Sequence, residues 1–88
     1  MKFLMTWWWT NENAKEVTTR FSKWKQQGKG KILYPISTMV GRNEAFTVVE
    51  TSDVADLQKE VQGWVDICTY DIIPIMDSTD AVRMAKSP

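Results

Sequence analysis

The first ten residues are apolar on both faces of the strand that they predict, because successive side chains of an extended chain point to opposite sides. One face carries Phe3, Met5, Trp7 and Trp9, and the other carries Leu4, Thr6 and Trp8. The three consecutive tryptophans therefore require an apolar layer on each side of the strand. A chain of 88 residues offers one layer of its own, and we expect the second to come from another copy of the chain.

The rest of the chain alternates between helical and extended patterns. Residues 13–27 predict a helix, since Asn13 and Glu16 match a capping box and apolar residues follow at helical spacing. Residues 53–62 predict a second helix, with Val54, Leu57 and Val61 on one side. The predicted strands are residues 31–40, 44–50 and 65–76, and a turn at 41–43 joins the first two of these as a hairpin.

The order of these elements indicates an α+β fold of the ferredoxin-like βαββαβ type, a four-stranded antiparallel sheet with two helices on one face. Pro35 and Pro74 each fall inside a predicted strand, where a proline cannot donate a ladder hydrogen bond. Both strands are therefore expected at the edges, with the first and third strands central. We expect one domain over residues 1–88, with a tail at 77–88 in which a short helix over 81–86 is an option.

A monomer of this fold would leave the second sheet face in water, an apolar patch of roughly several hundred Å². We expect two such faces to close on each other as a two-fold homodimer, a dimeric α+β barrel. The expected interface consists of Phe3, Met5, Trp7, Trp9, Phe46 and Val48. The smaller side chains of the opposite faces, such as Leu4 and Ala45, would then lie under the helices. The reverse assignment stays open, because Trp8 is large for a helix-covered position.

Charge and composition narrow the classes of partner and chemistry. Lys plus Arg and Asp plus Glu are both 11, so no net field draws the chain to nucleic acid, and no RNP-like motif is present. The chain has no histidine and a single cysteine, Cys68, which removes the commonest general base and metal ligand and any multi-cysteine zinc site. We expect no metal and no cofactor, and Cys68 as a small buried side chain.

Neither a membrane span nor a secretory leader is predicted. No segment reaches the ~18–20 apolar residues that a membrane helix needs. Lys2 and the apolar run at residues 3–9 resemble a leader only superficially, because the run is short and no small-residue cleavage site follows. We expect a cytoplasmic protein.

Candidate chemistry lies with the aromatic and acidic residues. A pocket for a flat apolar ligand is predicted from Trp7, Trp9, Tyr34, Phe46, Glu50 and Tyr70. The alternative is that these rings are core and dimer contacts. Glu50, Asp66 and Asp71 accompany apolar strands, and each is either a general base with a raised pKa or an acid at a strand end, paired with lysine or arginine.

Two basic segments have a structural and a functional interpretation. Arg20, Lys23 and Lys25 crowd the end of the first helix, where they are either a solvated helix end or a site for an anion. Gly28 and Gly30 alternate with lysines after that helix rather than after a strand, so we interpret them as a helix stop and not as a phosphate loop.

Four stretches carry a family resemblance: residues 1–7, 13–21, 46–50 and the run from Trp64-x-Asp66 to Ile72-x-Pro74. Together they resemble a family of small uncharacterised proteins of about ninety residues, which is similar to the dimeric α+β barrel superfamily. That superfamily contains antibiotic-biosynthesis monooxygenases, muconolactone isomerases and stress-responsive barrel proteins. The resemblance implies the fold and the dimer. Members with a histidine near the end of the second strand differ from this chain, which has Ser37 and Thr38 there.

Three hypotheses for function follow. The first is a dimeric barrel without catalysis that binds a small apolar ligand or is purely structural. The alternative is a cofactor-independent enzyme of the monooxygenase or isomerase type, acting on an apolar or aromatic substrate. A third is an interaction module that uses Trp8 or the tail on a larger partner.

Overall fold

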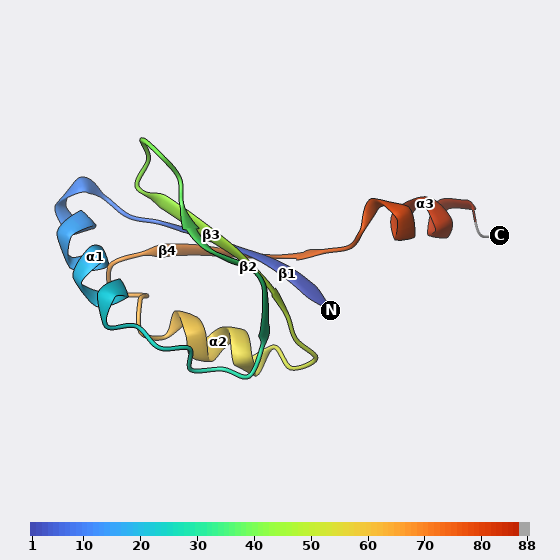
Figure 1. Ribbon diagram of the computed structural model, residues 1–88, viewed down its shortest axis with the longest axis horizontal. Helices are drawn as coiled ribbons and strands as arrows, with labels where there is room; N and C mark the ends of the chain where they lie inside the picture. The colour runs from blue at the N-terminus through green and yellow to red at the C-terminus, as the bar shows by residue number, and fades with distance from the viewer. Residues whose placement is uncertain (87–88) are drawn as a thin grey trace.

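The four predicted strands form one antiparallel sheet, and two helices cover one of its faces (Figure 1). The computed structural model describes residues 1–86. The strands are β1 (Lys2–Trp8), β2 (Lys31–Thr38), β3 (Glu44–Glu50) and β4 (Thr69–Ile75), in the order β2-β3-β1-β4. The helical segments are η1 (Asn11–Asn13), α1 (Ala14–Ser22), α2 (Ala55–Val61) and α3 (Ser78–Lys86). The expected ferredoxin-like α+β arrangement is confirmed, with β1 and β3 central and both proline-containing strands at the edges.

The first helix ends earlier than its apolar spacing predicts. α1 stops at Ser22, and residues 23–30 form a loop that runs toward α2. The Glu60 carboxylate on α2 accepts hydrogen bonds from the backbone N–H groups of Gln27 and Gly28, at 2.8 and 2.6 Å. These bonds satisfy the backbone outside a helix, so the prediction of a helix to residue 27 is wrong.

The start of α1 also differs from the predicted capping box. The Asn13 side chain makes no capping hydrogen bond, since Asn13 closes η1 instead of lying in an extended position. Glu16 pairs along the helix with Arg20, at 2.9 Å. At the far end of the chain, β4 begins at Thr69 instead of residue 65, because Trp64 accepts turn hydrogen bonds from the N–H groups of Ile67 and Cys68. Cys68 is buried, as expected.

The strand register shows which residues share a face. Residues that lie directly opposite each other in antiparallel strands point to the same side. Phe3 is opposite Val49, Met5 opposite Thr47, and Trp7 opposite Ala45. All six of these residues are buried, and they form the core with side chains of α1 and α2.

The expected grouping of Phe3, Met5 and Trp7 with Phe46 and Val48 on one face is therefore wrong. Phe46 and Val48 are opposite Thr6 and Leu4, on the face away from the helices. The small β3 side chains Ala45, Thr47 and Val49 lie under the helices as expected, whereas Leu4 and Thr6 of β1 do not, because the register places them opposite Val48 and Phe46. The helices α1 and α2 are short, with nine and seven residues. The large β1 side chains Phe3, Met5 and Trp7 pack beneath them.

We use the name open face for the sheet surface away from α1 and α2. Its middle carries Leu4, Thr6, Trp8, Tyr34, Phe46, Val48, Asp71 and Ile73, and its ends carry Lys2, Lys31, Glu44, Glu50 and Ile75. The Tyr34 and Phe46 rings stack there with centroids 5.4 Å apart, and Tyr34 and Ile73 are 49% and 44% exposed. Within residues 1–86, nothing covers this apolar surface.

α3 lies beyond the end of β4 and apart from the sheet (Figure 1). Lys2 at the start of β1 pairs with Asp77, the residue before α3, at 3.1 Å. Across the part of the chain that the structure describes, no helix has the length and apolar content to cross a bilayer.

The face assignment predicts different effects of two adjacent tryptophans on folding. Trp7→Ala should lower the free energy of unfolding by about 3–5 kcal/mol, because it removes a buried ring from the core. Trp8→Ala removes a ring on the open face and should cost clearly less. Urea unfolding, at concentrations where the midpoint no longer depends on protein concentration, measures both. Equal losses would contradict the assignment.

Candidate functional site

A cavity lies between the helix-covered face of the sheet, the two helices and the loop at residues 23–30. Its volume is about 40 Å³, whereas a single water needs roughly 10–15 Å³ on the same measure. The apolar lining consists of Met5, Trp7, Phe21, Trp24, Ile32, Ile36, Val49, Leu57, Trp64 and Tyr70. The other lining residues are Gln26, Gly30, Thr47, Asp56 and Glu60. The cavity is thus a narrow, mainly aromatic space.

Two pairs of stacked rings form the flat walls of the cavity. Trp7 on β1 stacks on Tyr70 on β4, with ring centroids 5.4 Å apart and planes at 23°. Phe21 on α1 stacks on Trp24 in the loop, with centroids 5.9 Å apart and planes at 14°. The first pair is fixed by the sheet, and the second stands at the exposed side, where Phe21 is 45% exposed.

The Tyr70 hydroxyl is the one hydroxyl of the aromatic wall, whose tryptophans carry indole N–H groups. Burial raises the pKa of Tyr70 above its usual value, so the hydroxyl keeps its proton at neutral pH. It makes no hydrogen bond to any of the described residues. A protonated, unengaged hydroxyl beside an apolar cavity is suited to donate a hydrogen bond to a bound molecule.

Two acids of α2 hold the loop that closes the cavity. In addition to the hydrogen bonds that Glu60 accepts from the loop, Asp56 Oδ1 accepts a hydrogen bond from the Lys29 N–H at 3.1 Å. Asp56 Oδ2 accepts one from the Thr51 hydroxyl at 2.9 Å. The hydrogen bond from Lys29, followed by that from Thr51, lowers the pKa of Asp56 below its usual value. Both acids are therefore engaged as acceptors for the protein's own donors.

Two glycines allow the loop at residues 23–30 to pack closely against α2 and β3. A Cβ on Gly28 would lie 2.7 Å from the Asp56 carbonyl oxygen, and a Cβ on Gly30 would lie 2.7 Å from a Val49 methyl carbon. These distances are shorter than real Cβ contacts allow. The two glycines were interpreted from the sequence as a helix stop, whereas the structure uses them for close packing of the loop on α2 and β3.

Asp66 lies outside the cavity in an ion pair. Arg20 donates from both terminal nitrogens to the two Asp66 carboxylate oxygens, each at 2.7 Å, and also to the Gly63 carbonyl oxygen at 3.0 Å. The hydrogen bonds from Arg20 lower the pKa of Asp66. Of the two interpretations of Asp66, pairing with arginine is confirmed and a general base with a raised pKa is wrong. Arg20 is likewise engaged by carboxylates rather than open to an anion.

The six residues of the predicted pocket do not form one site. Trp7 and Tyr70 line the cavity, but Tyr34 and Phe46 lie on the open face. Glu50 is exposed at the end of β3, opposite Lys2 and Lys31 of the neighbouring strands. This part of the prediction is corrected because the two faces of the sheet separate the residues.

Trp9 lies in a shallow hollow at the opposite end of β1 from Lys2. The hollow is lined by Trp8, Trp9, Arg42, Asn43 and Glu44. The backbone N–H of Trp9 donates a hydrogen bond to the Asn43 carbonyl oxygen at 3.0 Å. The buried indole Nε1–H of Trp9 has no acceptor within residues 1–86. The ion pair of Arg42 and Glu44, at 2.9 Å, closes one side of the hollow.

Sequence reasoning missed the residues that the helices and the loop bring to the cavity. Trp24 and Trp64 recur at helical spacing, which places them toward the sheet but does not distinguish a filled core from a cavity. Gln26 and Gly30 belong to an aperiodic segment. Among the described residues, no group of three or more acidic or cysteine side chains could hold a metal ion.

One family model matches the chain, over residues 1–87, and its description is Domain of unknown function (DUF3303). A search of curated proteins finds no match.

The Asp56 carboxylate predicts a pH-dependent stability. The pKa of Asp56 is lower in the folded chain than the ordinary value of about 3.9. Its stabilising contribution is therefore complete above that value and is lost as the pH falls through the folded pKa. Asp56→Asn should destabilise the protein at pH 7, and the difference from wild type should shrink below about pH 4.

Unfolding of both proteins by urea at pH 7 and pH 3.5 measures this. Asp71→Asn is the control for loss of a carboxylate, since Asp71 is exposed on the open face and should change stability little. A destabilisation by Asp56→Asn that is the same at both pH values would contradict the role assigned to the Asp56 carboxylate.

Proposed function

Because the chain belongs to the DUF3303 family, whose description gives no activity, we propose from the site itself that the protein binds a small, flat, mainly apolar molecule and does so as a homodimer. The observation that carries this proposal is the cavity walled by aromatic rings with one unengaged hydroxyl, that of Tyr70. The cytoplasmic location and the lack of nucleic-acid, metal and cofactor partners expected from the sequence stay predictions.

The size of the cavity limits the ligand. A cavity of about 40 Å³ is well below the ~150 Å³ of an engineered cavity that binds benzene. Entry therefore requires movement of a wall. The Phe21 and Trp24 pair is suited to this, because Phe21 is partly exposed and Trp24 belongs to a loop without regular structure. A single-ring aromatic with one hydrogen-bond acceptor, such as a phenol, is the expected chemical class.

The groups around the cavity support binding over the alternative of a cofactor-independent enzyme. Proton abstraction requires a base that faces the substrate. Asp56 and Glu60 accept hydrogen bonds from the loop backbone, and the raised pKa of Tyr70 keeps its hydroxyl protonated. These side chains are arranged to shape a cavity and to donate one hydrogen bond.

The open face supports the homodimer. Its central residues Leu4, Phe46 and Val48 are apolar and only half-buried within one protomer. Contiguous apolar surfaces of a few hundred Å² mark interaction sites in soluble proteins. Asp71 lies on the edge strand β4, at the rim of such an interface, where its carboxylate can stay in contact with water.

Binding can be followed through the five tryptophan indole N–H signals in ¹H–¹⁵N NMR spectra, with 4-methylphenol as the probe. The signals of Trp7, Trp24 and Trp64 should shift, because these rings line the cavity. Those of Trp8 and Trp9 should not. Shifts confined to Trp8 and Trp9, or no shifts up to the solubility of the probe, would contradict the proposed site.

Variants of this titration define the site further. Ile36→Phe narrows the cavity and should weaken 4-methylphenol binding at least about tenfold, whereas Ile73→Phe on the open face should leave it unchanged. Tyr70→Phe should weaken binding of 4-methylphenol by about 0.5–1.5 kcal/mol, the net value of one hydrogen bond. It should not weaken binding of toluene, which has no acceptor.

The dimer can be tested by sedimentation equilibrium. Val48→Glu places a charge in the centre of the open face and should convert the dimer to a monomer. Val54→Glu is the matched control, since Val54 is 68% exposed beside α2 on the other side of the sheet. A wild-type chain that stays monomeric at micromolar concentration, or a Val48→Glu variant that dimerises as well as wild type, would overturn the dimer.

A further inference from the structure

α3 is a helix without a surface to pack against in its own protomer. None of its residues is buried, and Val82 and Met84 are 53% and 64% exposed. Figure 1 shows the helix at the end of an arm that continues from β4, and the arm contributes to a longest dimension of 51 Å against 28 Å for the next. The pair of Lys2 and Asp77, at 3.1 Å, connects the start of this arm to the start of β1.

The residues of α3 divide into two sides. At about 100° per residue, the apolar side chains gather on one side, which consists of Ala81, Val82, Met84 and Ala85 together with Ser78 at the first position. Thr79, Asp80, Arg83 and Lys86 occupy the other, where Asp80 and Arg83 pair at 3.3 Å. A helix of nine residues is marginal in water on its own and depends on packing of its apolar side.

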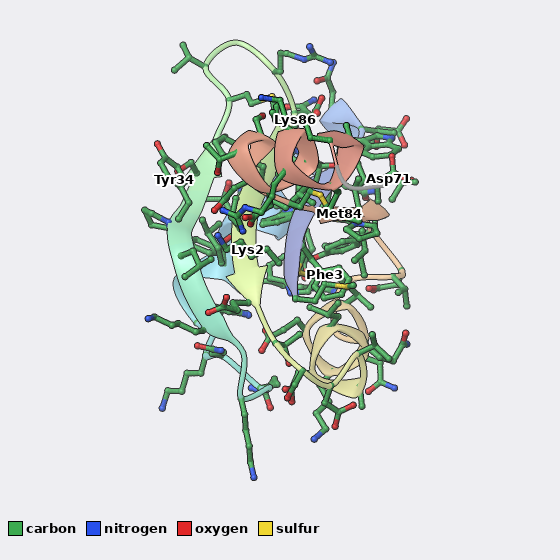
Figure 2. All side chains as sticks on the ribbon, turned by 90° about the vertical axis from the view of Figure 1, so that its right-hand side faces the viewer. Lys2, Phe3, Tyr34, Asp71, Met84 and Lys86 are labelled. Atoms are coloured by element: carbon green, nitrogen blue, oxygen red, sulfur yellow. The ribbon has the colours of Figure 1, made fainter. Side chains whose placement is uncertain are left out.

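The open face is the complementary surface that the same chain provides. Figure 2 looks at the molecule from the side of the arm, with α3 in front, Met84 and Lys86 on it, and Tyr34 projecting from β2. The apolar side of α3 and the open face are both uncovered among the described residues. A two-fold dimer brings each of them to the other protomer in a single, reciprocal contact.

The size of the open face is a second reason for this pairing. Strands of seven or eight residues are about 23 Å long, so four of them at a spacing of about 4.8 Å project an area of roughly 440 Å². A stable interface buries about 800 Å² on each partner. The sheet face by itself projects less than this area, and a helix from the partner that packs on the open face adds its own apolar surface to the interface.

We propose that the apolar side of α3 packs on the open face of a second copy of the chain, so that two protomers exchange their C-terminal helices. This inference rests on the proposed homodimer and names the segment that completes its interface. The two-residue connection, Met76 and Asp77, directs α3 away from its own sheet, and exchange is the arrangement that covers both surfaces at once.

The proposal is tested in the full chain by the dimer dissociation constant from sedimentation equilibrium. Met84→Glu places a charge on the apolar side and should raise this constant at least about tenfold, since the change occurs twice in the dimer. Lys86→Gln alters the net charge by the same amount on the polar side and should change it less than about threefold. Neither residue is buried in the protomer, so folding of the protomer is unaffected.

An unchanged dissociation constant for Met84→Glu would overturn the exchange while leaving the homodimer intact. A wild-type chain that does not dimerise would instead overturn the homodimer and the exchange with it. Binding of α3 to a different protein or to its own sheet also predicts an unchanged or lower dissociation constant for Met84→Glu. The two proposals are therefore distinguished by the same measurement.

A second measurement locates the helix. A Met84→Cys chain carrying a nitroxide spin label is mixed with ¹⁵N-labelled wild-type chain, so that only contacts between protomers broaden the observed signals. Cys68 is buried, and this burial raises the pKa of its thiol to about 11, so both access and thiolate content disfavour its reaction with the label. Backbone signals of Leu4, Phe46 and Val48 should broaden in the mixed dimer. Signals that stay sharp across the open face would overturn the proposal.

Discussion

Alternation of side chains along β1 forces adjacent tryptophans onto opposite sides of the sheet, and the rest of the structure follows from that constraint. Trp7 points toward the helices, where it is buried and stacks on Tyr70. Trp8 points to the open face. Because β1 is central, its two faces determine the two functional surfaces: a cavity between sheet and helices, and an apolar sheet surface without a cover in the protomer.

The fold could be predicted because its signals are periodic. Proline in β2 and β4 placed both strands at the edges, and the order of elements defined the topology. The assignment of faces failed because alternation separates residues into two sets without saying which set the helices cover. That choice depends on helix length and position. α1 ends at Ser22, and the sheet supplies large rings such as Trp7 to fill the space under a short helical layer.

The cavity was predicted only in part for a related reason. Trp7 and Tyr70 are found there, but the loop at residues 23–30 is built from tertiary hydrogen bonds to Glu60 and Asp56. No local pattern encodes those bonds. In the sequence, a Gly-Lys repeat after a helix resembles a helix stop. The structure shows close packing instead, because a Cβ on Gly28 would lie 2.7 Å from the Asp56 carbonyl oxygen of α2. Long-range packing defines the site, whereas local pattern defines the elements.

The positions of the two surfaces are compatible with the proposed ligand binding and the proposed dimer at the same time. The Phe21 and Trp24 pair lies on the helix side of the sheet, while the open face and α3 lie away from it. A partner on the open face therefore leaves the entrance of the cavity free. The surfaces still share β1 and β3, whose alternate residues point to the helix-covered face and to the open face. In the proposed dimer, packing of a partner on Leu4 and Val48 would hold these strands in place, and with them the cavity wall formed by Met5, Trp7 and Val49.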